Sequence, residues 1–329
     1  MHRAIARRGC IVTAWNRLLS RGGAGQNALG RVAIFPGTLC TLGVAVAAGD
    51  ASAAGRPRAT PSPVFTGEST LTQGLAWQRA RAGKWSGSLV LHPADYRALQ
   101  VEAPKVPPAE RRDAVRWQLK DLVDFAVDKA SVDTLNIPGP IPGASSDRMV
   151  AIIAPSERIA GWMAQYREQR CALDSIDIPE MAMRNLAALA AGDAAVAFMH
   201  IGLSVTRITV VWQRELCSFR HIELSAHQLA DANDSDREAL IDRLALNIQR
   251  TTDAFARQFH GADLGQLLLS SVACADEVRT RLAEMTGMNV QPFDLTEHLQ
   301  WPAEQAMWDL AQDYDYTIAA GAALRPPGL

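Results

Sequence analysis

Short apolar runs alternate with amphipathic stretches along the chain, and this pattern predicts an α/β fold. Near the start, apolar runs at 32–37 and 41–47 flank the turn-prone Pro36-Gly37 and predict a two-strand hairpin, followed by a Gly/Pro/Ser/Arg-rich loop at 50–63. The rest of the first half predicts strands at 89–91, 99–101, 132–139, 149–154 and 173–178, and helices at 71–82, 109–125, 156–169 (with Ser156 as N-cap) and 179–191.

The second half repeats this order of elements. Residues 194–224 predict three consecutive strands, with turns near Gly202 and at Gln213-Arg214. The elements expected after them are a helix at 237–260, a strand at 264–271, a helix at 276–286, a strand at 288–295 and a small-residue helix at 317–325. Because each half begins with a strand meander and adds crossover helices, we expect two duplicated lobes, 31–192 and 193–329, around a central cleft.

The charge distribution singles out an N-terminal arm, residues 1–30. Six arginines and no acidic residue precede Asp50, and the apolar residues between 11 and 19 fall at near-helical spacing. Two interpretations stay open: a weak tether to an acidic membrane surface, or a disordered leader. The whole chain has a net charge of -2, which gives no general attraction to nucleic acid, so no nucleic-acid partner is expected.

Residues 32–48, followed by the small residues 51–54, imitate the apolar core and cleavage site of an export signal. Against export, Pro36-Gly37 interrupts the run, the basic leader is long, and a hairpin explains the same residues. No apolar run is long enough to span a membrane without turn residues, so a soluble body is expected. The five cysteines are scattered without CxxC spacing, which favours small buried apolar residues in a reducing compartment over disulfides or zinc ligands.

Three stretches of the chain stand out as a set: 107–139 (PPAERRDAVRWQLKDLVDFAVDKASVDTLNIPG), 175–187 (SIDIPEMAMRNLA) and 244–259 (LALNIQRTTDAFARQF). In this order, they resemble landmarks of the MshI/PilM family of type IV pilus proteins. The resemblance covers roughly 88–325, while the first hairpin matches by position and shape. It implies an actin-like fold, that is, a two-lobed duplicated fold of the ASKHA, ribonuclease H-like class. MshI is the member associated with the mannose-sensitive haemagglutinin (MSHA) pilus.

The resemblance also implies where a nucleotide would bind, and several residues depart from that pattern. Phe35 and His200 stand where magnesium-organising aspartates are expected, and Leu42 replaces a phosphate-neutralising lysine. Val272 replaces a glycine of the adenosine loop. We therefore expect no cofactor, no metal and no enzymatic activity, with weak ATP binding left open. The degenerate nucleotide site, if used, would comprise Gly37, Thr38, Gly202, Ser204, Thr206, Ser270 and Ser271.

No other catalytic motif competes, and the pair His221 and Glu223 is typical of a strand surface.

The implied function is that of a cytoplasmic scaffold, peripherally associated with the inner membrane. It would bind the cytoplasmic tail of an inner-membrane PilN/MshJ-like protein, together with other pilus assembly subunits. Two alternatives stay open: an ATP-binding switch of the same machine, and an exported or transit-targeted enzyme with an unrecognised site. The partner-binding candidates are Arg116, Trp117, Glu180 and Met181, as charged rim and apolar anchors.

Overall fold

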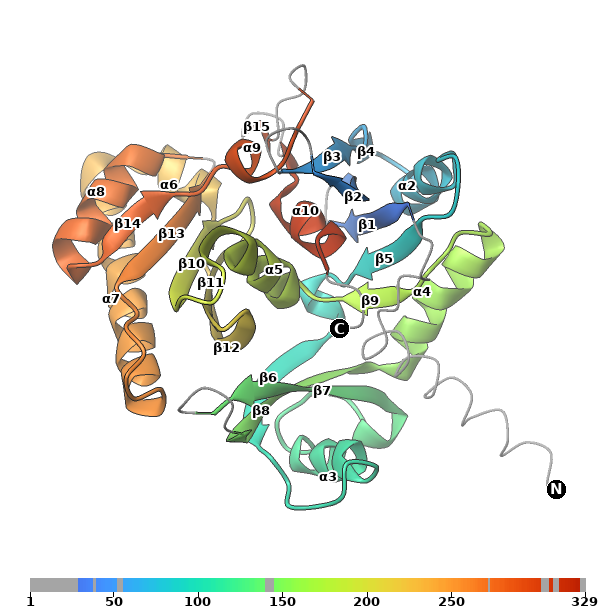
Figure 1. Cartoon of the computed structure of the whole chain (residues 1–329), viewed down its shortest axis with the longest axis horizontal. Coiled ribbons are helices and arrows are strands. Elements are labelled where there is room, and N and C mark those ends of the chain that lie inside the picture. Colours follow the sequence, from blue (N-terminus) through green and yellow to red (C-terminus); the bar gives the residue numbers. More distant parts are fainter. Residues whose placement is uncertain are drawn as a thin grey trace.

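Two central β-sheets, each an antiparallel meander continued by parallel strands, form the body of the protein (Figure 1). The computed structural model describes residues 29–37, 40–51, 56–139, 145–271, 273–302, 308–309 and 314–325. The basic arm predicted at 1–30 lies outside the described residues except for Leu29 and Gly30. The predicted α/β architecture with two meander-led halves is confirmed.

The first sheet has the strand order β3-β2-β1-β5-β9. The predicted hairpin is present, with Phe35 opposite Leu42. Part of the predicted loop at 50–63 is instead an edge strand, because Ala59 and Pro61 face inward and an edge tolerates proline. The elements are β1 (Gly30–Pro36), β2 (Cys40–Ala51), β3 (Pro57–Pro61), β4 (Phe65–Thr66, paired with β2), α2 (Thr70–Arg79), β5 (Ser86–Val90) and β9 (Ser175–Asp177).

The second sheet repeats this plan in the order β12-β11-β10-β13-β14, and its three predicted meander strands are confirmed. Its strands are β10 (Val196–Ile201), β11 (Thr206–Trp212), β12 (Glu215–Ile222), β13 (Gln266–Ser271) and β14 (Asn289–Pro292). Its helices are α6 (Ala226–Asp231), α7 (Asp234–Gln258), α8 (Ala275–Thr286) and α9 (Leu295–His298), and the short strands β15 (Trp308–Asp309) and β16 (Tyr314–Asp315) follow.

A third, small sheet is inserted into the first half, between β5 and β9, and lies below the two main sheets in Figure 1. Its order is β6-β8-β7, so β7 forms one edge. Helix α3 ends at Gln118, whereas the predicted helix continues to residue 125. Val115 and Leu119 are buried, and Leu122 is exposed. The elements are β6 (Arg97–Glu102), α3 (Arg111–Gln118), β7 (Ala130–Pro138) and β8 (Ser145–Pro155), with the one-turn helices Pro93–Asp95 and Val127–Lys129.

Helix α4 (Ser156–Glu168) leads from this insertion back to the first sheet. The prediction that Ser156 caps α4 is wrong. Ser156 is the first helical residue, and its hydroxyl lies 2.8 Å from the Ser131 hydroxyl of β7.

The last helix of each half packs against the sheet of the other half. Helix α5 (Pro179–Ala191) contacts β10, β11 and β12, whereas α10 (Thr317–Ala323) contacts β1, β2 and β5. The two helices also pack against each other, and a Cβ at Gly321 would lie 2.3 Å from the Ala182 carbonyl oxygen. The lobes predicted at 31–192 and 193–329 therefore meet through exchanged helices.

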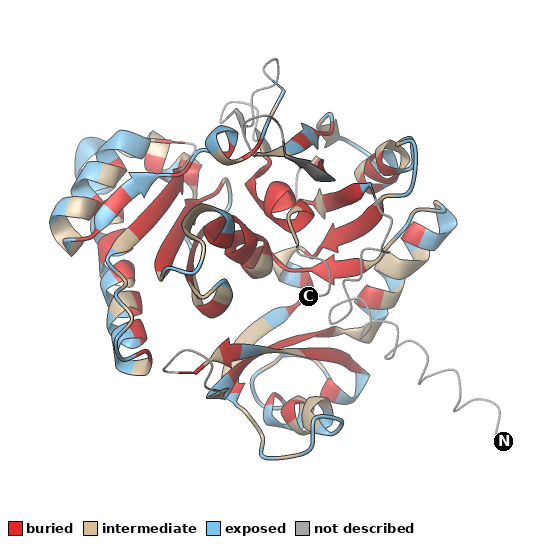
Figure 2. Ribbon diagram, in the orientation of Figure 1, coloured by how far each residue is buried: buried red, intermediate tan, exposed pale blue. Residues whose placement is uncertain are grey.

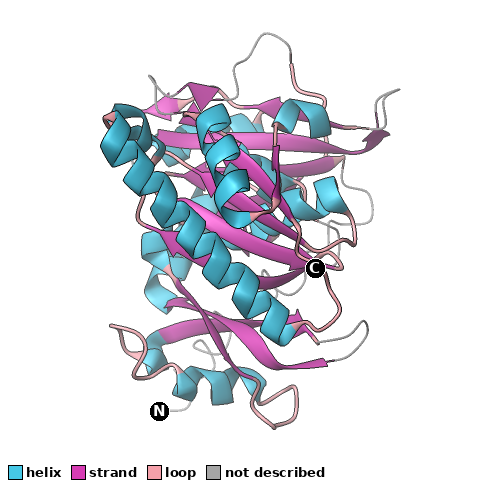
Figure 3. Ribbon diagram, turned by 90° about the vertical axis from the view of Figure 1, so that its left-hand side faces the viewer, coloured by secondary structure: helices cyan, strands magenta, loops and turns pink. Residues whose placement is uncertain are grey.

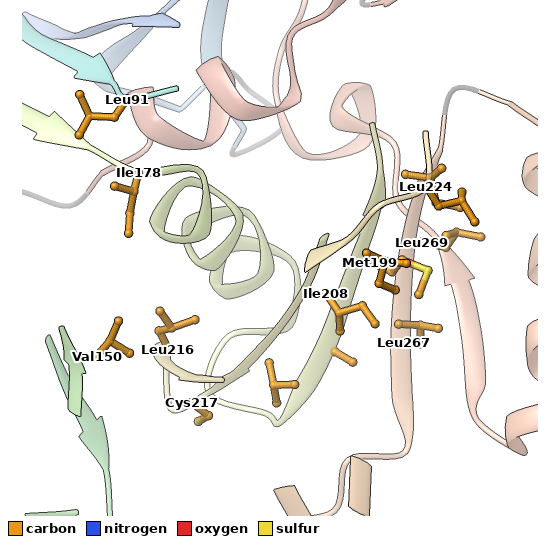
Figure 4. Packing of buried hydrophobic residues seen from close by; sticks show 14 of the residues in the cluster. Leu91, Val150, Ile178, Met199, Ile208, Leu216, Cys217, Leu224, Leu267 and Leu269 are labelled. Atoms are coloured by element: carbon orange, nitrogen blue, oxygen red, sulfur yellow. The ribbon is translucent and has the colours of Figure 1, made fainter. Parts of the chain in front are cut away.

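Buried residues concentrate in the strands of both main sheets and in α5 and α10, as Figure 2 shows. The apolar cluster is continuous across the insertion: Figure 4 shows Val150 of β8, Leu216 of β12 and Ile178 directed toward one another. This shared core fixes the position of the inserted sheet relative to β12 and α5.

Of the described cysteines, Cys217 is buried and the others are half-buried. Burial raises the pKa of the Cys217 thiol to about 12, which keeps it protonated and unreactive. Among the described residues, no helix combines the length and the apolar character needed to cross a membrane.

Candidate functional site

The two glycine turns face each other across a cavity of about 500 Å³ between the lobes, which we call the cleft. Phe35, Gly37 and Leu42 line it from the first hairpin, and Gly202 and Ser204 line it from the turn between β10 and β11. The predicted cleft between related meanders is confirmed, with the segments in separate sheets.

His200 occupies the predicted aspartate position of the second turn and is held by two partners. Its Nε2 lies 2.8 Å from Oδ2 of Asp315, and its Nδ1 lies 3.3 Å from the Ser270 hydroxyl. Asp315 also accepts a hydrogen bond from the backbone N–H of Thr317, at the start of α10. Burial alone would raise the pKa of Asp315, but the charge and hydrogen bond of His200, with the Thr317 bonds, lower it to about 2.

A second histidine pair lies further along the same side of the second sheet. His221 Nε2 lies 2.8 Å from Oε1 of Glu180, and the Tyr96 hydroxyl donates to Oε2 of Glu180 at 2.6 Å. Burial acts to raise the pKa of Glu180. The hydrogen bond and charge of His221 and the hydrogen bond from Tyr96 act in the opposite direction, and they leave the pKa of Glu180 below its usual range. Burial, reinforced by Glu180, raises the pKa of Tyr96. The predicted partner of His221, Glu223, is not the residue it pairs with.

The remaining candidate nucleotide residues do not converge on the cleft. The Thr206 hydroxyl donates to the Leu224 carbonyl oxygen at 2.8 Å, and the Ser271 hydroxyl donates to the Ala273 carbonyl oxygen at 2.7 Å. Ser270 faces His200. Thr38 and Val272 lie outside the described residues.

These residues do not fit the hydrated magnesium and nucleotide phosphates that the family resemblance implies. Phe35 offers the first turn no oxygen ligand, and both ring nitrogens of His200 are engaged by protein groups. Across the positions that the structure describes, no three His, Cys, Asp or Glu side chains are grouped to hold a metal ion. The pairing of His200 with Asp315 was not predicted. The sequence places Asp315 two residues before Thr317, a pattern typical of helix starts, but this pattern says nothing of His200.

A second and larger hollow, about 630 Å³, lies between the inserted sheet, α5 and β12; we call it the groove. Its apolar lining includes Ile137, Ile152, Ile178, Met181 and Leu216. Edge strand β7 runs along it from Asp133 to Pro138. The groove thus combines an apolar floor with a strand edge that, within the described chain, pairs only with β8.

Charged residues surround the apolar floor, and most are paired. Arg184 contacts Glu215 at 3.2 Å, and Arg325 contacts Asp177 at 3.2 Å. Asp133, at the start of the groove segment of β7, accepts two bonds from Arg112; its burial nevertheless raises its pKa.

Of the four predicted partner-binding residues, the structure brings only Met181 into the groove. The prediction that Glu180 is an exposed charge at the rim is wrong, because this residue is 1% exposed and is bonded to Tyr96 and His221. Arg116 and Trp117 belong to α3, which packs on the inserted sheet through Val115. Trp117 is 62% exposed, and Arg116 pairs with Asp113 at 2.6 Å.

The two meander-led sheets, their exchanged helices and the cleft between them define the actin-like ATPase fold. No protein-family model matches the chain, and no curated protein is similar to it in sequence. Solved structures are similar in fold. A chain of the PilM-PilN type IV pilus biogenesis complex matches with a TM-score of 0.60 and 16% identity, over 91% of this chain and 98% of that one.

A protein of unknown function with an actin-like ATPase fold, from Bacteroides thetaiotaomicron, matches with a TM-score of 0.50 and 9% identity, over 89% of this chain and 95% of that one. The cytoplasmic domain of EpsL, an inner-membrane component of the type II secretion system of Vibrio cholerae, matches with a TM-score of 0.48 and 10% identity, over 86% of this chain and 93% of that one. At these identities, the first two similarities establish the fold alone.

Proposed function

We propose that this chain is a non-enzymatic, MshI/PilM-like scaffold of a type IV pilus machine that binds an extended segment of a partner protein in the groove. The observation that carries the proposal is that β7, which among the described strands pairs only with β8, lines the groove beside an apolar floor. The fold similarity to a chain from the PilM-PilN complex supports the class of partner. The misfit of the cleft to magnesium and nucleotide supports a role without ATP hydrolysis.

An edge strand offers alternate N–H and C=O groups to an added strand, which supplies affinity independent of sequence. Apolar side chains of the added segment would contact Met181, Ile178 and Leu216. The paired charges at the rim, such as Arg184 with Glu215, would exchange bonds with polar groups of the segment and set its register.

The partner we propose is the cytoplasmic tail of a PilN- or MshJ-like inner-membrane protein, with other pilus assembly subunits contacting the remaining surface. This places the scaffold in the cytoplasm, held at the membrane by its partner. The arginines of the arm would add contact with acidic lipid. The first described residue after the arm, Leu29, is held by its N–H, which donates to the Lys84 carbonyl oxygen.

The test measures binding of a labelled peptide, matching the cytoplasmic tail of the PilN-like protein encoded nearby, by fluorescence anisotropy. Asn136→Arg adds bulk and charge in the groove at an exposed position of β7 and should weaken binding at least about tenfold, or about 1.4 kcal/mol. Gln165→Arg makes the same change at an exposed position of α4 and should leave affinity unchanged.

Trp117→Ala tests the rival surface on α3, because this side chain is exposed and lies outside the groove. We expect unchanged affinity. Loss of binding in Trp117→Ala together with full binding in Asn136→Arg would place the partner on α3 and refute the groove.

A further inference from the structure

Three basic side chains form a row across the second sheet, facing the cleft. His200 of β10 is directly opposite Arg207 of β11, and Arg207 is directly opposite His221 of β12. Directly opposed residues of antiparallel strands point to the same face of a sheet. All three residues line the cleft.

The two outer members of the row each have a carboxylate of their own. Asp315, ahead of α10, contacts His200 at 2.8 Å, and Glu180, in the first turn of α5, contacts His221 at 2.8 Å. The central member has none. Among the described residues, no ion pair to Arg207 is present; the residue is 7% exposed, and its buried Nε has no hydrogen-bond partner.

A buried guanidinium N–H without a partner is costly, because it loses hydration and gains no hydrogen bond in return. The carboxylates nearest in the row are already engaged by the histidines. Glu223 also lines the cleft, but it is exposed to water and forms no ion pair with Arg207. His92 and His227 line the same cavity and bring no negative charge.

We propose that Arg207 binds the carboxylate group of a ligand that enters the cleft, without a metal ion. Asp315 and Glu180 are each bonded to their own histidine, so neither carboxylate pairs with Arg207. A ligand carboxylate fits the planar guanidinium fork of Arg207 with two parallel bonds. A phosphate dianion would place a second negative charge near Asp315 and Glu180.

The rest of the ligand is apolar, because Phe35, Leu42 and Ile318 form much of the remaining wall. The cleft has a volume of about 500 Å³, which is more than a carboxylate group occupies. This volume is typical of small-molecule sites. The carboxylate could belong to a free organic acid or to an acidic side chain beside an apolar one in a partner segment, and both sources share this chemistry.

The test measures melting temperature and, by calorimetry, affinity at pH 7 and constant ionic strength, with sodium salts of acetate, hexanoate, benzoate and phosphate against chloride. We expect a saturable rise in melting temperature with hexanoate and benzoate, a weaker rise with acetate, and no change on adding magnesium or EDTA. A capped Phe-Glu dipeptide identifies the source: tighter binding than benzoate assigns the carboxylate to a partner segment, and weaker binding assigns it to a free acid.

Arg207→Gln should abolish the response to carboxylates while leaving the melting temperature in chloride equal or higher, since it removes an unpaired buried charge. Arg207→Lys, which lacks the fork, should bind at least about tenfold more weakly. Arg220→Gln changes a half-buried arginine of β12 outside the cleft and should respond like wild type. The proposal fails if Arg207→Gln is strongly destabilised in chloride, or if its melting temperature responds to carboxylates like that of wild type. It also fails if no carboxylate binds to wild type, or if phosphate binds better than benzoate.

Discussion

Replacing Asp315 by asparagine tests whether the bridge between His200 and Asp315 joins the two lobes. His200 lies in the second sheet, whereas Asp315 immediately precedes α10, which packs on the first sheet. Asparagine keeps the size of the side chain and an oxygen that can accept from the Thr317 N–H. The variant therefore removes the negative charge of Asp315 and replaces the oxygen that faces Nε2 of His200 by an NH2 group, which cannot accept a hydrogen bond.

The structure sets the expected magnitude. Lowering the pKa of Asp315 from its ordinary 3.8 to about 2 corresponds to about 2 kcal/mol of folding free energy at neutral pH. Removing one partner of a buried pair costs about 3–5 kcal/mol in general, so we expect a loss of about 2–4 kcal/mol. Because the folded-state pKa is depressed, this stabilisation is complete above the ordinary pKa and disappears as the pH falls through the folded value. About half of it should remain at pH 3.

The assay is urea unfolding of wild type and Asp315→Asn at pH 7, 5 and 3, analysed only where tryptophan fluorescence and circular dichroism give coincident transitions. Asp193→Asn is the matched control. Its carboxylate lies 3.0 Å from Arg214, but both side chains are more than half exposed, so it should cost less than about 1 kcal/mol. Equal losses in the two variants, or a difference between wild type and Asp315→Asn that does not narrow from pH 5 to 3, would refute the reasoning.

Three further outcomes are expected. Gly321→Ala should lower the free energy of unfolding in urea by about 1–3 kcal/mol, because its Cβ would lie 2.3 Å from the Ala182 carbonyl oxygen. Gly161→Ala is the control: a Cβ there would meet nothing within 4 Å, so this variant should be neutral or slightly stabilising. Tyr96→Phe should cost about 1–2 kcal/mol by the same measurement, because buried Glu180 loses its hydroxyl donor. In thermal-shift assays, millimolar ATP with magnesium should stabilise the protein no more than ATP with EDTA; a shift abolished by EDTA would contradict the misfit of the cleft.

The alternation of apolar runs and amphipathic helices predicted the order of most elements, because each of these strands and helices is formed by its own local pattern. The edge strand β3 and helix α6 were missed. Helix α5 begins at Pro179 and ends at Ala191, as the proline and the periodicity predict. The chain after Gln118 is different. Its spacing continues to fit a helix, but the inserted sheet is small and buries only Val115 and Leu119, so Leu122 gains nothing from a further turn.

The candidate sites were less predictable, because they depend on pairings between distant parts of the chain. Nothing local to His200 indicates that Asp315 will contact it, since the exchange of α5 and α10 brings them together. Glu180 was predicted as a rim charge, but His221 and Tyr96 enclose it. Strand β7 was predicted, whereas its position at a sheet edge follows only from the order β6-β8-β7.

The cleft and the groove share one structural element, helix α5. At its first turn, Glu180 points to the cleft side and bonds His221, while the next residue, Met181, lines the groove. Successive residues of a helix point in directions about 100° apart, so a single turn serves both surfaces. His200 with Asp315 and His221 with Glu180 connect the second sheet to the exchanged helices. A partner segment that displaces α5 from the groove side must therefore strain the His221–Glu180 pair, which ties the groove to the cleft by direct contact.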